Sequence, residues 1–145
     1  MPVHPARVED QLCFALYAAS RAVAAAYRPL LRELDLTYPQ YLVMLCLWES
    51  DSMTVTDIGR TLGLDSGTLS PLLQRLSAAG LVRRERQADD ERVVRIHLTG
   101  EGRAIEEKAG LVREQVEGST GLTGKEFAGL RTSLHALTAT ISGTA

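Results

Sequence analysis

The sequence has little of the chemistry that metal centres and disulfide frameworks need. Its 145 residues include two cysteines, Cys13 and Cys46, and three histidines, His4, His97 and His135. Two thiols cannot complete a metal site by themselves, and the histidines are widely separated without ligand spacing. We therefore expect no metal and no bound cofactor. In a reducing compartment we expect both thiols to be free at rest.

Long apolar runs are also missing. No stretch of about 18 apolar residues, the length of a membrane-spanning helix, occurs in the chain. A signal peptide's basic stretch and apolar core are absent from the first residues, MPVHPARVEDQLC. Hydrophobic residues make up 45% of the chain and charged residues 23%, a globular composition and not a disordered one. We expect a soluble cytoplasmic protein without a membrane partner.

A basic surplus is missing as well, since the formal net charge is −2. Proteins that bind nucleic acid normally carry excess positive charge. The charges are nevertheless unevenly distributed. Between positions 83 and 95 lie five arginines and four acids, namely Arg83, Arg84, Arg86, Arg92 and Arg95 with Glu85, Asp89, Asp90 and Glu91. The local distribution therefore matters more than the sum.

Apolar periodicity predicts helices at both ends of the chain. Residues 8 to about 34 form the first, which Pro29 should kink or stop near its end. Another is expected from residue 100 to about 117, and a capping box at Thr123 and Glu126 begins the last. The last helix carries a narrow apolar seam, typical of a coiled-coil interface, at Phe127, Leu130, Leu134, Leu137 and Ile141.

These terminal helices have two possible roles. Their apolar stripes either pack on their own domain or form the interface of a dimer. Symmetric twofold association is the commonest kind of oligomer, so we expect a homodimer. The dimerisation helices would span about residues 6–34 and 100–145 of a single domain that covers residues 1–145.

The middle of the chain carries the signals of three short helices. Thr37 and Gln40 form a capping box before an apolar run, and Thr54 caps the next helix. Gly63 suits a left-handed helix stop, and Asp65 can cap a further helix. That further helix has one apolar stripe, at Leu69, Leu72, Leu73 and Leu76. Two helices joined by a tight glycine turn are therefore predicted.

A β-hairpin is predicted after these helices. Residues 81–86 and 93–98 form its strands, and Val94, Ile96 and Leu98 alternate with polar residues along the second. Helix, turn, helix and hairpin is the order of a winged helix-turn-helix, here at about residues 37–99. The expected fold class is therefore mainly α with a small β-wing, plus N- and C-terminal dimerisation helices.

The predicted helix after Gly63 would lie in the major groove of DNA. Its apolar stripe faces inward, which leaves outward-facing groups able to contact bases or phosphates, at Ser66, Thr68, Ser70, Gln74 and Arg75. On the wing we expect Arg86 to bind DNA and Arg92 to enter the minor groove. A solvated, mixed-charge turn is the alternative interpretation of the wing. Asp65 and Asp90 are predicted to orient the wing, Asp65 by pairing with Arg92.

The motifs of this region resemble those of the MarR family of bacterial regulators. They are LDSGTL at residues 64–69 on the expected DNA-contacting helix, and DER at residues 90–92 followed by IHLT at 96–99 on the wing. A narrower resemblance covers most of residues 9–108. The segments EDQLCFALY (9–17), LTYPQY (36–41) and LWE (47–49) resemble the organic-hydroperoxide resistance regulators, a peroxide-sensing branch.

The resemblance implies that Cys13 is a redox sensor. In that branch a cysteine near the start of the first helix is oxidised, and tyrosines of the partner chain, corresponding to Tyr27 and Tyr38, hydrogen-bond its sulfur. Tyr17 lies one turn away and would assist. A position early in a helix favours a thiolate, and a phenolic hydroxyl is a suitable donor to it. Alternatively, these residues only fill the core; for Cys46, among apolar neighbours, that interpretation is preferred.

The resemblance also implies the mechanism. No cysteine follows Cys46, so a C-terminal resolving thiol is missing and the chain resembles the single-cysteine subtype. Oxidation by an organic hydroperoxide, then capping by a low-molecular-weight thiol or overoxidation, would release a palindromic double-stranded operator. One alternative is a repressor released by a small phenolic ligand, with Cys13 structural. Another is a thiol peroxidase, but its recycling arrangement is missing, so we expect no enzyme.

Overall fold

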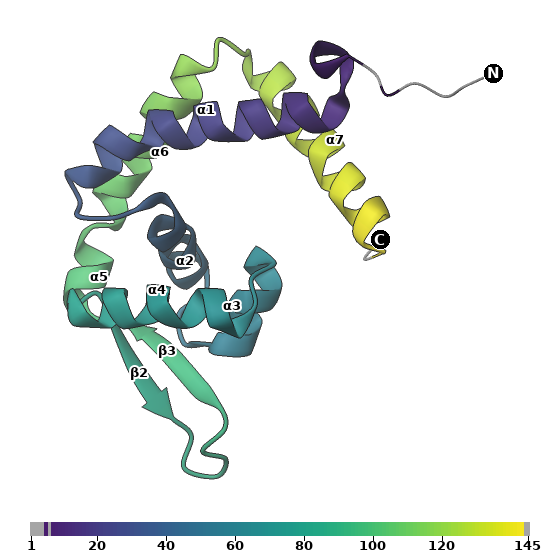
Figure 1. The fold of residues 1–145 in the computed structure, drawn as a ribbon. Helices are drawn as coiled ribbons and strands as arrows, with labels where there is room; N and C mark the ends of the chain where they lie inside the picture. Colours follow the sequence, from purple (N-terminus) through teal and green to yellow (C-terminus); the bar gives the residue numbers. More distant parts are fainter. Residues whose placement is uncertain (1–4, 6, 144–145) are drawn as a thin grey trace. The chain divides into compact units, whose positions relative to one another are not determined.

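The computed structural model describes Pro5 and residues 7–143 (Figure 1). His4, the predicted boundary at residue 6 and the last two residues lie outside the described part. Packing divides the chain into two compact units, Met1–Val112 and Arg113–Ala145. The elements in chain order are η1 (Val8–Asp10), α1 (Leu12–Arg32), α2 (Tyr38–Glu49), β1 (Met53–Thr54), α3 (Val55–Leu62), α4 (Ser66–Ala78), β2 (Val82–Arg86), β3 (Val94–Leu98), α5 (Gly100–Ala104), α6 (Glu106–Ser119) and α7 (Gly124–Ser142).

Side-chain caps determine where several helices begin. The hydroxyl of Thr37 accepts from Gln40 N at 3.3 Å, and Gln40 Oε1 accepts from Thr37 N at 2.9 Å. Thr123 and Glu126 make the same reciprocal pair at 3.2 and 3.0 Å. Each cap satisfies amide groups that a helix start leaves without partners. Both predicted capping boxes are confirmed.

The turn between α3 and α4 follows the same local rules. Gly63 ends α3 in the left-handed region with φ 68°, which glycine adopts without strain. Asp65 Oδ1 accepts from the amide of Thr68 at 2.8 Å and so caps α4. The four leucines of the predicted stripe on α4 are buried. The predicted helix-turn-helix is therefore confirmed.

The sheet has one strand more than predicted. Strands β2 and β3 form the expected antiparallel hairpin, which extends beyond the helices in Figure 1. The two-residue strand β1 pairs with the other edge of β3, with Met53 opposite Ile96, and the order is β1-β3-β2. This short strand fixes the base of the wing to the segment before α3.

Two predicted helices are interrupted. Residues 8–10 form a separate 3₁₀ turn, and α1 begins only at Leu12. It then continues past Pro29 to Arg32, so the proline does not stop it. The helix predicted from residue 100 is divided at Ile105 into α5 and α6.

The core of the first unit lies between α2, α3, α4 and the sheet, which pack on one another. Its largest fully buried side chains are Leu31, Val43, Met44, Leu47, Ile58, Leu69, Leu73, Leu76 and Ile96. Only the last third of α1 contributes, through Tyr27 and Leu31. The core therefore supports the helix-turn-helix and the wing and leaves most of α1 uncovered.

The helix α7 of the second unit has no buried residues in the described part of the chain. Leu130 and Ile141 of the predicted seam are 51% and 77% exposed. Phe127, Leu134 and Leu137 of the same seam are half-buried. Within the described residues, none of the helices combines the length and the apolarity that crossing a membrane requires.

Asp51 connects the base of the sheet to α5. Its Oδ1 accepts from the amides of Ser52 at 2.7 Å and Leu98 at 2.9 Å, and its Oδ2 pairs with Arg103. We expect Asp51→Ala to lower the free energy of unfolding by about 2 kcal/mol, because it leaves part-buried amides without acceptors. Urea denaturation measures the loss. Asp51→Asn retains the Oδ1 acceptor and should lose about half as much; an equal loss would contradict this explanation.

Candidate functional site

α4 presents exposed polar side chains outside its stripe of buried leucines. Of the predicted contact residues, Ser66, Thr68, Gln74 and Arg75 are exposed, whereas Ser70 is half-buried. The exposed hydroxyl, amide and guanidinium groups suit contacts with base edges and phosphates. The structure therefore leaves four of the five predicted side chains fully available on one helix.

The pairing register divides the side chains of the wing between two faces. Arg84 lies opposite Ile96, and Val82 lies opposite Leu98. Paired residues share a face, and side chains two apart on a strand lie on the same side. Arg84 and Arg86 therefore lie on the face that carries the buried Val82, Ile96 and Leu98. We call this the front face, and the opposite side of the hairpin the back face.

The back face contains interacting charges of both signs. Arg83 Nη1 and His97 Nε2 lie 2.9 and 3.2 Å from Glu85 Oε2, although the histidine contact lacks the alignment of a hydrogen bond. Arg83, with His97, holds the pKa of Glu85 below its ordinary value. His97 Nδ1 lies 2.7 Å from Ser52 Oγ, and Arg95 donates to Ser52 O at 2.8 Å. These side chains stabilise the hairpin.

The front face carries arginines without acidic partners. Arg84 is exposed and forms no ion pair with any residue that the structure describes. Arg86 donates to the carbonyl oxygen of Glu91 at 2.9 Å, a contact that leaves its charge uncompensated. Sequence reasoning selected Arg86 and missed Arg84. The period-two alternation along the strand was the signal that could have found it.

At the tip of the wing, Asp90 orients Arg92. Asp90 Oδ1 accepts from Arg92 N at 3.1 Å and from Nε at 3.2 Å, and the arginine side chain is 91% exposed. The predicted pairing of Asp65 with Arg92 is wrong. The carboxylate of Asp65 instead accepts hydrogen bonds from Thr68, which lower its pKa. A cap formed within α4 replaces the proposed contact with the wing.

Cys13 lies in the first turn of α1, as predicted. The residue is exposed, and its Sγ donates to Gln11 Oε1 at 3.2 Å. The thiol is therefore accessible to a reagent in solution.

Within one chain, Cys13 is separated from two of the predicted tyrosines. Tyr27 is fourteen positions further along α1, which is about 21 Å at about 1.5 Å per residue. The rings of Tyr27 and Tyr38 lie together instead, with centroids 5.3 Å apart. A contact between the sulfur and these hydroxyls therefore requires a second chain.

The other aromatic residues have local roles. Tyr17 is 61% exposed, and the guanidinium of Arg21 lies 5.4 Å from the centre of its ring. Tyr41, which sequence reasoning did not select, completes a cluster with Tyr27 and Tyr38 at 5.2 and 6.1 Å. The cluster joins the buried end of α1 to α2.

Cys46 differs from Cys13 in its exposure to solvent. It lies on α2, is only 6% exposed, and its pKa is raised by burial and by the nearby Glu49. A buried thiol of raised pKa reacts slowly, because the thiolate is the nucleophile. The structure agrees with a packing role for this residue.

A hollow of about 560 Å³ lies where α1 ends and α2 begins. Arg28 and Arg32 line it from α1, and Tyr38 from α2. Burial raises the pKa of Tyr38, so its hydroxyl stays protonated as a donor. Asp35 lines the hollow as well, so two guanidinium groups, one carboxylate and a phenol leave a net positive charge that suits a small aromatic anion.

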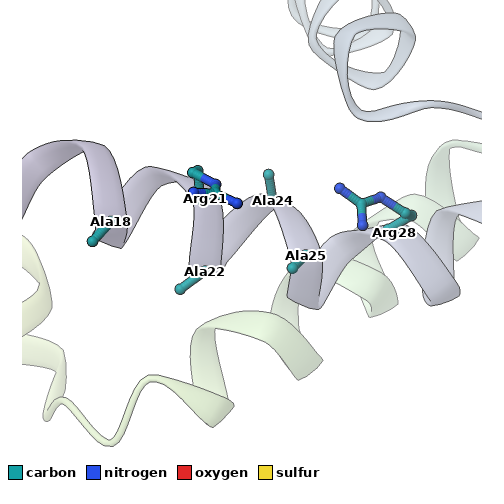
Figure 2. Close-up of a pocket in the computed structure, with 6 residues that line it drawn as sticks. All are labelled: Ala18, Arg21, Ala22, Ala24, Ala25 and Arg28. Atoms are coloured by element: carbon teal, nitrogen blue, oxygen red, sulfur yellow. The ribbon is translucent and has the colours of Figure 1, made fainter.

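Much of α1 is uncovered in the single chain. Figure 2 shows Ala18, Ala22 and Ala25 pointing to one side of the helix and two arginines pointing to another. Near the N-terminus, Leu12, Phe14 and Tyr17 are 62%, 45% and 61% exposed. Exposed apolar residues with small residues beside them favour close packing with another surface. Across the described residues, no group of three or more His, Cys, Asp or Glu side chains is placed to hold a metal.

Comparisons with known proteins identify one class of protein. A family model described as the transcriptional regulator SarA/Rot matches residues 25–109. The organic hydroperoxide resistance transcriptional regulator of Bacillus subtilis (strain 168) is 44% identical over 135 residues, covering 93% of this chain and 92% of that one. The HTH-type transcriptional regulator TtmR of Methylorubrum extorquens (strain PA1) is 50% identical over 139 residues, covering 91% and 71%.

A solved structure extends the similarity to the fold. The structure of reduced AbfR bound to DNA matches this chain with a TM-score of 0.80 and 39% identity, covering 94% of each chain. AbfR is a protein of Staphylococcus epidermidis. The similar proteins are DNA-binding transcriptional regulators and not enzymes.

Proposed function

We propose that this chain is a repressor that leaves its operator when Cys13 is oxidised. The chain belongs to the MarR family of transcriptional regulators and to its organic-hydroperoxide resistance branch. The observation that carries the proposal is the exposed thiol in the first turn of α1. The protein would act in the bacterial cytoplasm as a homodimer on double-stranded DNA. Its helix-turn-helix and wing, at about residues 37–99, would bind each half of a palindrome.

The DNA contacts follow from the two exposed surfaces of the first unit. α4 would enter the major groove with Ser66, Thr68, Ser70, Gln74 and Arg75 as contacts. On the wing, Arg84 and Arg86 of the front face would neutralise phosphates, and Arg92 would enter the minor groove. Asp90 supports this role because it fixes the start of the Arg92 side chain.

Dimerisation would bring the sensor and the tyrosines together. The uncovered apolar residues of α1 and the seam of α7 supply surface for a second chain. Tyr27 and Tyr38 of one chain would then donate to the sulfur of Cys13 in the other, with Tyr17 nearby. The separation of Cys13 from Tyr27 within one chain supports this exchange. Loss of these contacts on oxidation would change the spacing of the two DNA-binding surfaces.

The proposed chemistry is a two-electron oxidation. The Cys13 thiolate attacks the outer oxygen of an organic hydroperoxide; a sulfur–oxygen bond forms and the oxygen–oxygen bond breaks. The hydroperoxide proton passes to the departing alkoxide, which leaves as an alcohol, and the sulfur becomes a sulfenic acid once protonated. A low-molecular-weight thiol then displaces the hydroxyl group as water and forms a mixed disulfide. Further peroxide would instead give the overoxidised acids.

Selection from a randomised duplex pool tests DNA binding by the reduced protein. We expect a palindrome whose half-sites are centred about 10 base pairs apart, one turn of DNA. Fluorescence anisotropy at fixed salt then compares reduced protein with protein treated with cumene hydroperoxide and cysteine. We expect at least tenfold weaker binding after treatment, with the added mass on Cys13. Unchanged binding would refute sensing, and a failed selection would refute the DNA-binding role.

Arg84→Ala tests the front face of the wing. We expect about tenfold weaker DNA binding, and a salt dependence of log Kd that is shallower by about one phosphate contact. Anisotropy titrations at several salt concentrations measure both. Arg83→Ala, one residue away on the back face, is the matched control and should alter neither value appreciably. Equal effects of the two substitutions would show that the front face has no special role.

A second candidate function is a repressor released by a small phenolic anion, with Cys13 structural. The hollow with Arg28, Arg32 and Tyr38 favours it. Salicylate and cumene hydroperoxide, added separately to the DNA complex, distinguish the two. Release by salicylate alone, prevented by Arg28→Ala, would favour this candidate.

A further inference from the structure

The line of α4 opposite its buried leucines is formed by Gly67, Pro71 and Gln74. The buried stripe consists of Leu69, Leu72, Leu73 and Leu76. At about 3.6 residues per turn, Gly67, Pro71 and Gln74 lie within roughly 30° of the direction opposite the middle of that stripe. Thr68 and Arg75 lie roughly 70° or more from it by the same rule. Gly67 and Pro71 are both exposed.

We propose that Gly67 and Pro71 form the line of closest contact between α4 and the major groove, where Pro71 selects a thymine. This inference rests on the proposed function, because it concerns how α4 fits DNA. The bare backbone at Gly67 would allow a base-pair edge to approach closely. The ring of Pro71 would pack against the C5-methyl group, the one apolar group that thymine presents in the major groove.

The fit of a helix in the groove explains why a glycine matters there. An α-helix with its side chains is about 10–12 Å wide, and the major groove is about 12 Å wide. Every atom on the outermost line therefore limits the depth of insertion. A Cβ at Gly67 would meet only Asp65 Oδ1, at 3.4 Å, so the protein itself leaves room for a side chain. Gly67 is the second residue of α4, so the cost of about 1 kcal/mol that glycine has in a helix interior does not apply in full there, but nothing in the fold requires a glycine either.

Pro71 is also a residue that the packing of α4 does not explain. A proline inside a helix removes a backbone donor and disfavours the helix, yet Pro71 is exposed and lies within α4. Its neighbours Ser70 and Leu72 provide the packing of this turn, as half-buried and buried residues. Pro71, which disfavours the helix, and Gly67, which has no side chain, therefore both lie on the line opposite the buried leucines, beside the exposed Gln74. Contact with DNA gives both a physical reason.

Gly67→Ala tests the close approach. The substitution favours the helix and fits the free protein, so the melting temperature should not fall. The added methyl group should nevertheless weaken binding to the selected duplex at least tenfold. Ser77→Ala, on the flank of the same helix, is the control and should leave binding unchanged. Unchanged DNA binding by Gly67→Ala would overturn this part of the inference.

Replacing thymine by deoxyuridine tests the role of Pro71, because it removes only the methyl group. In the selected palindrome, we expect a symmetric thymine whose replacement weakens wild-type binding roughly fourfold per half-site, the effect of about one buried methyl group. Pro71→Ala should already bind thymine DNA more weakly and lose nothing further with deoxyuridine. The inference would be overturned if deoxyuridine weakened DNA binding equally in the wild-type and Pro71→Ala proteins, or if it did not weaken binding by the wild-type protein. A wild-type protein that selects no sequence would instead refute the proposed function.

Discussion

Cys13→Ser is expected to bind the operator like the wild-type protein and to remain bound after treatment with organic hydroperoxide and a thiol. Serine keeps the size of the side chain and can still donate to Gln11, so the first turn of α1 should be preserved. It cannot form a sulfenic acid, because oxygen lacks the oxidation states of sulfur. The wild-type response, at least tenfold in Kd, should fall to none.

The experiment has a matched control in the second cysteine. Cys46→Ala removes the buried thiol, and a response of wild-type size should remain. Anisotropy before and after cumene hydroperoxide, with a mass spectrum of each sample, separates the two residues. Retained release in Cys13→Ser would remove the sensor from the mechanism. Loss of release in Cys46→Ala would assign a redox role to the buried thiol.

Gly102→Ala is expected to destabilise the protein by about 3 kcal/mol or more. Gly102 is buried in α5, and a Cβ at this position would overlap the carbonyl oxygen of Leu81 and lie 3.3 Å from Leu98 Cδ2. Backbone atoms cannot move aside as the end of a flexible side chain can. The carbonyl of Gly102 also accepts from Trp48 Nε1 at 2.9 Å, which ties α5 to α2.

Urea denaturation at one protein concentration measures this loss. Gly110→Ala is the control, because Gly110 also lies in a helix but has no atom within 4 Å of the position of a Cβ. Alanine there should stabilise the protein by up to about 1 kcal/mol. We therefore expect Gly102→Ala to lower the free energy of unfolding and Gly110→Ala to raise it. A Gly102→Ala protein as stable as the wild type would show that α5 can shift away from the sheet.

Local signals in the sequence predicted much of the fold. The caps at Thr37, Asp65 and Thr123, and the stop at Gly63, depend on a few neighbouring residues, and all four are as predicted. The wing strands begin within one residue of their predicted positions, because alternation along a strand is also a local pattern.

Features that depend on distant residues were not predictable in this way. Strand β1 has only two residues, and its pairing with Ile96 joins segments more than forty positions apart. The requirement for glycine at position 102 comes from the carbonyl of Leu81, which no nearby pattern reveals. The predicted pair of Asp65 and Arg92 does not form, because each side chain hydrogen-bonds a residue within three positions of it, Thr68 and Asp90 respectively.

The candidate site was predictable to a similar extent. Sequence reasoning found the polar residues of α4 because polar side chains suggest contacts. It did not select Gly67, Pro71 or Arg84, whose importance depends on the direction in which they face. The roles of Tyr27 and Tyr38 stay a prediction, since they involve a second chain.

The division of the wing into two faces also affects how the protein meets its target. The formal charge of the whole chain is −2, while Arg84 and Arg86 give the front face a local positive charge. On the proposed function, this local charge would favour encounters in which the wing meets the operator first.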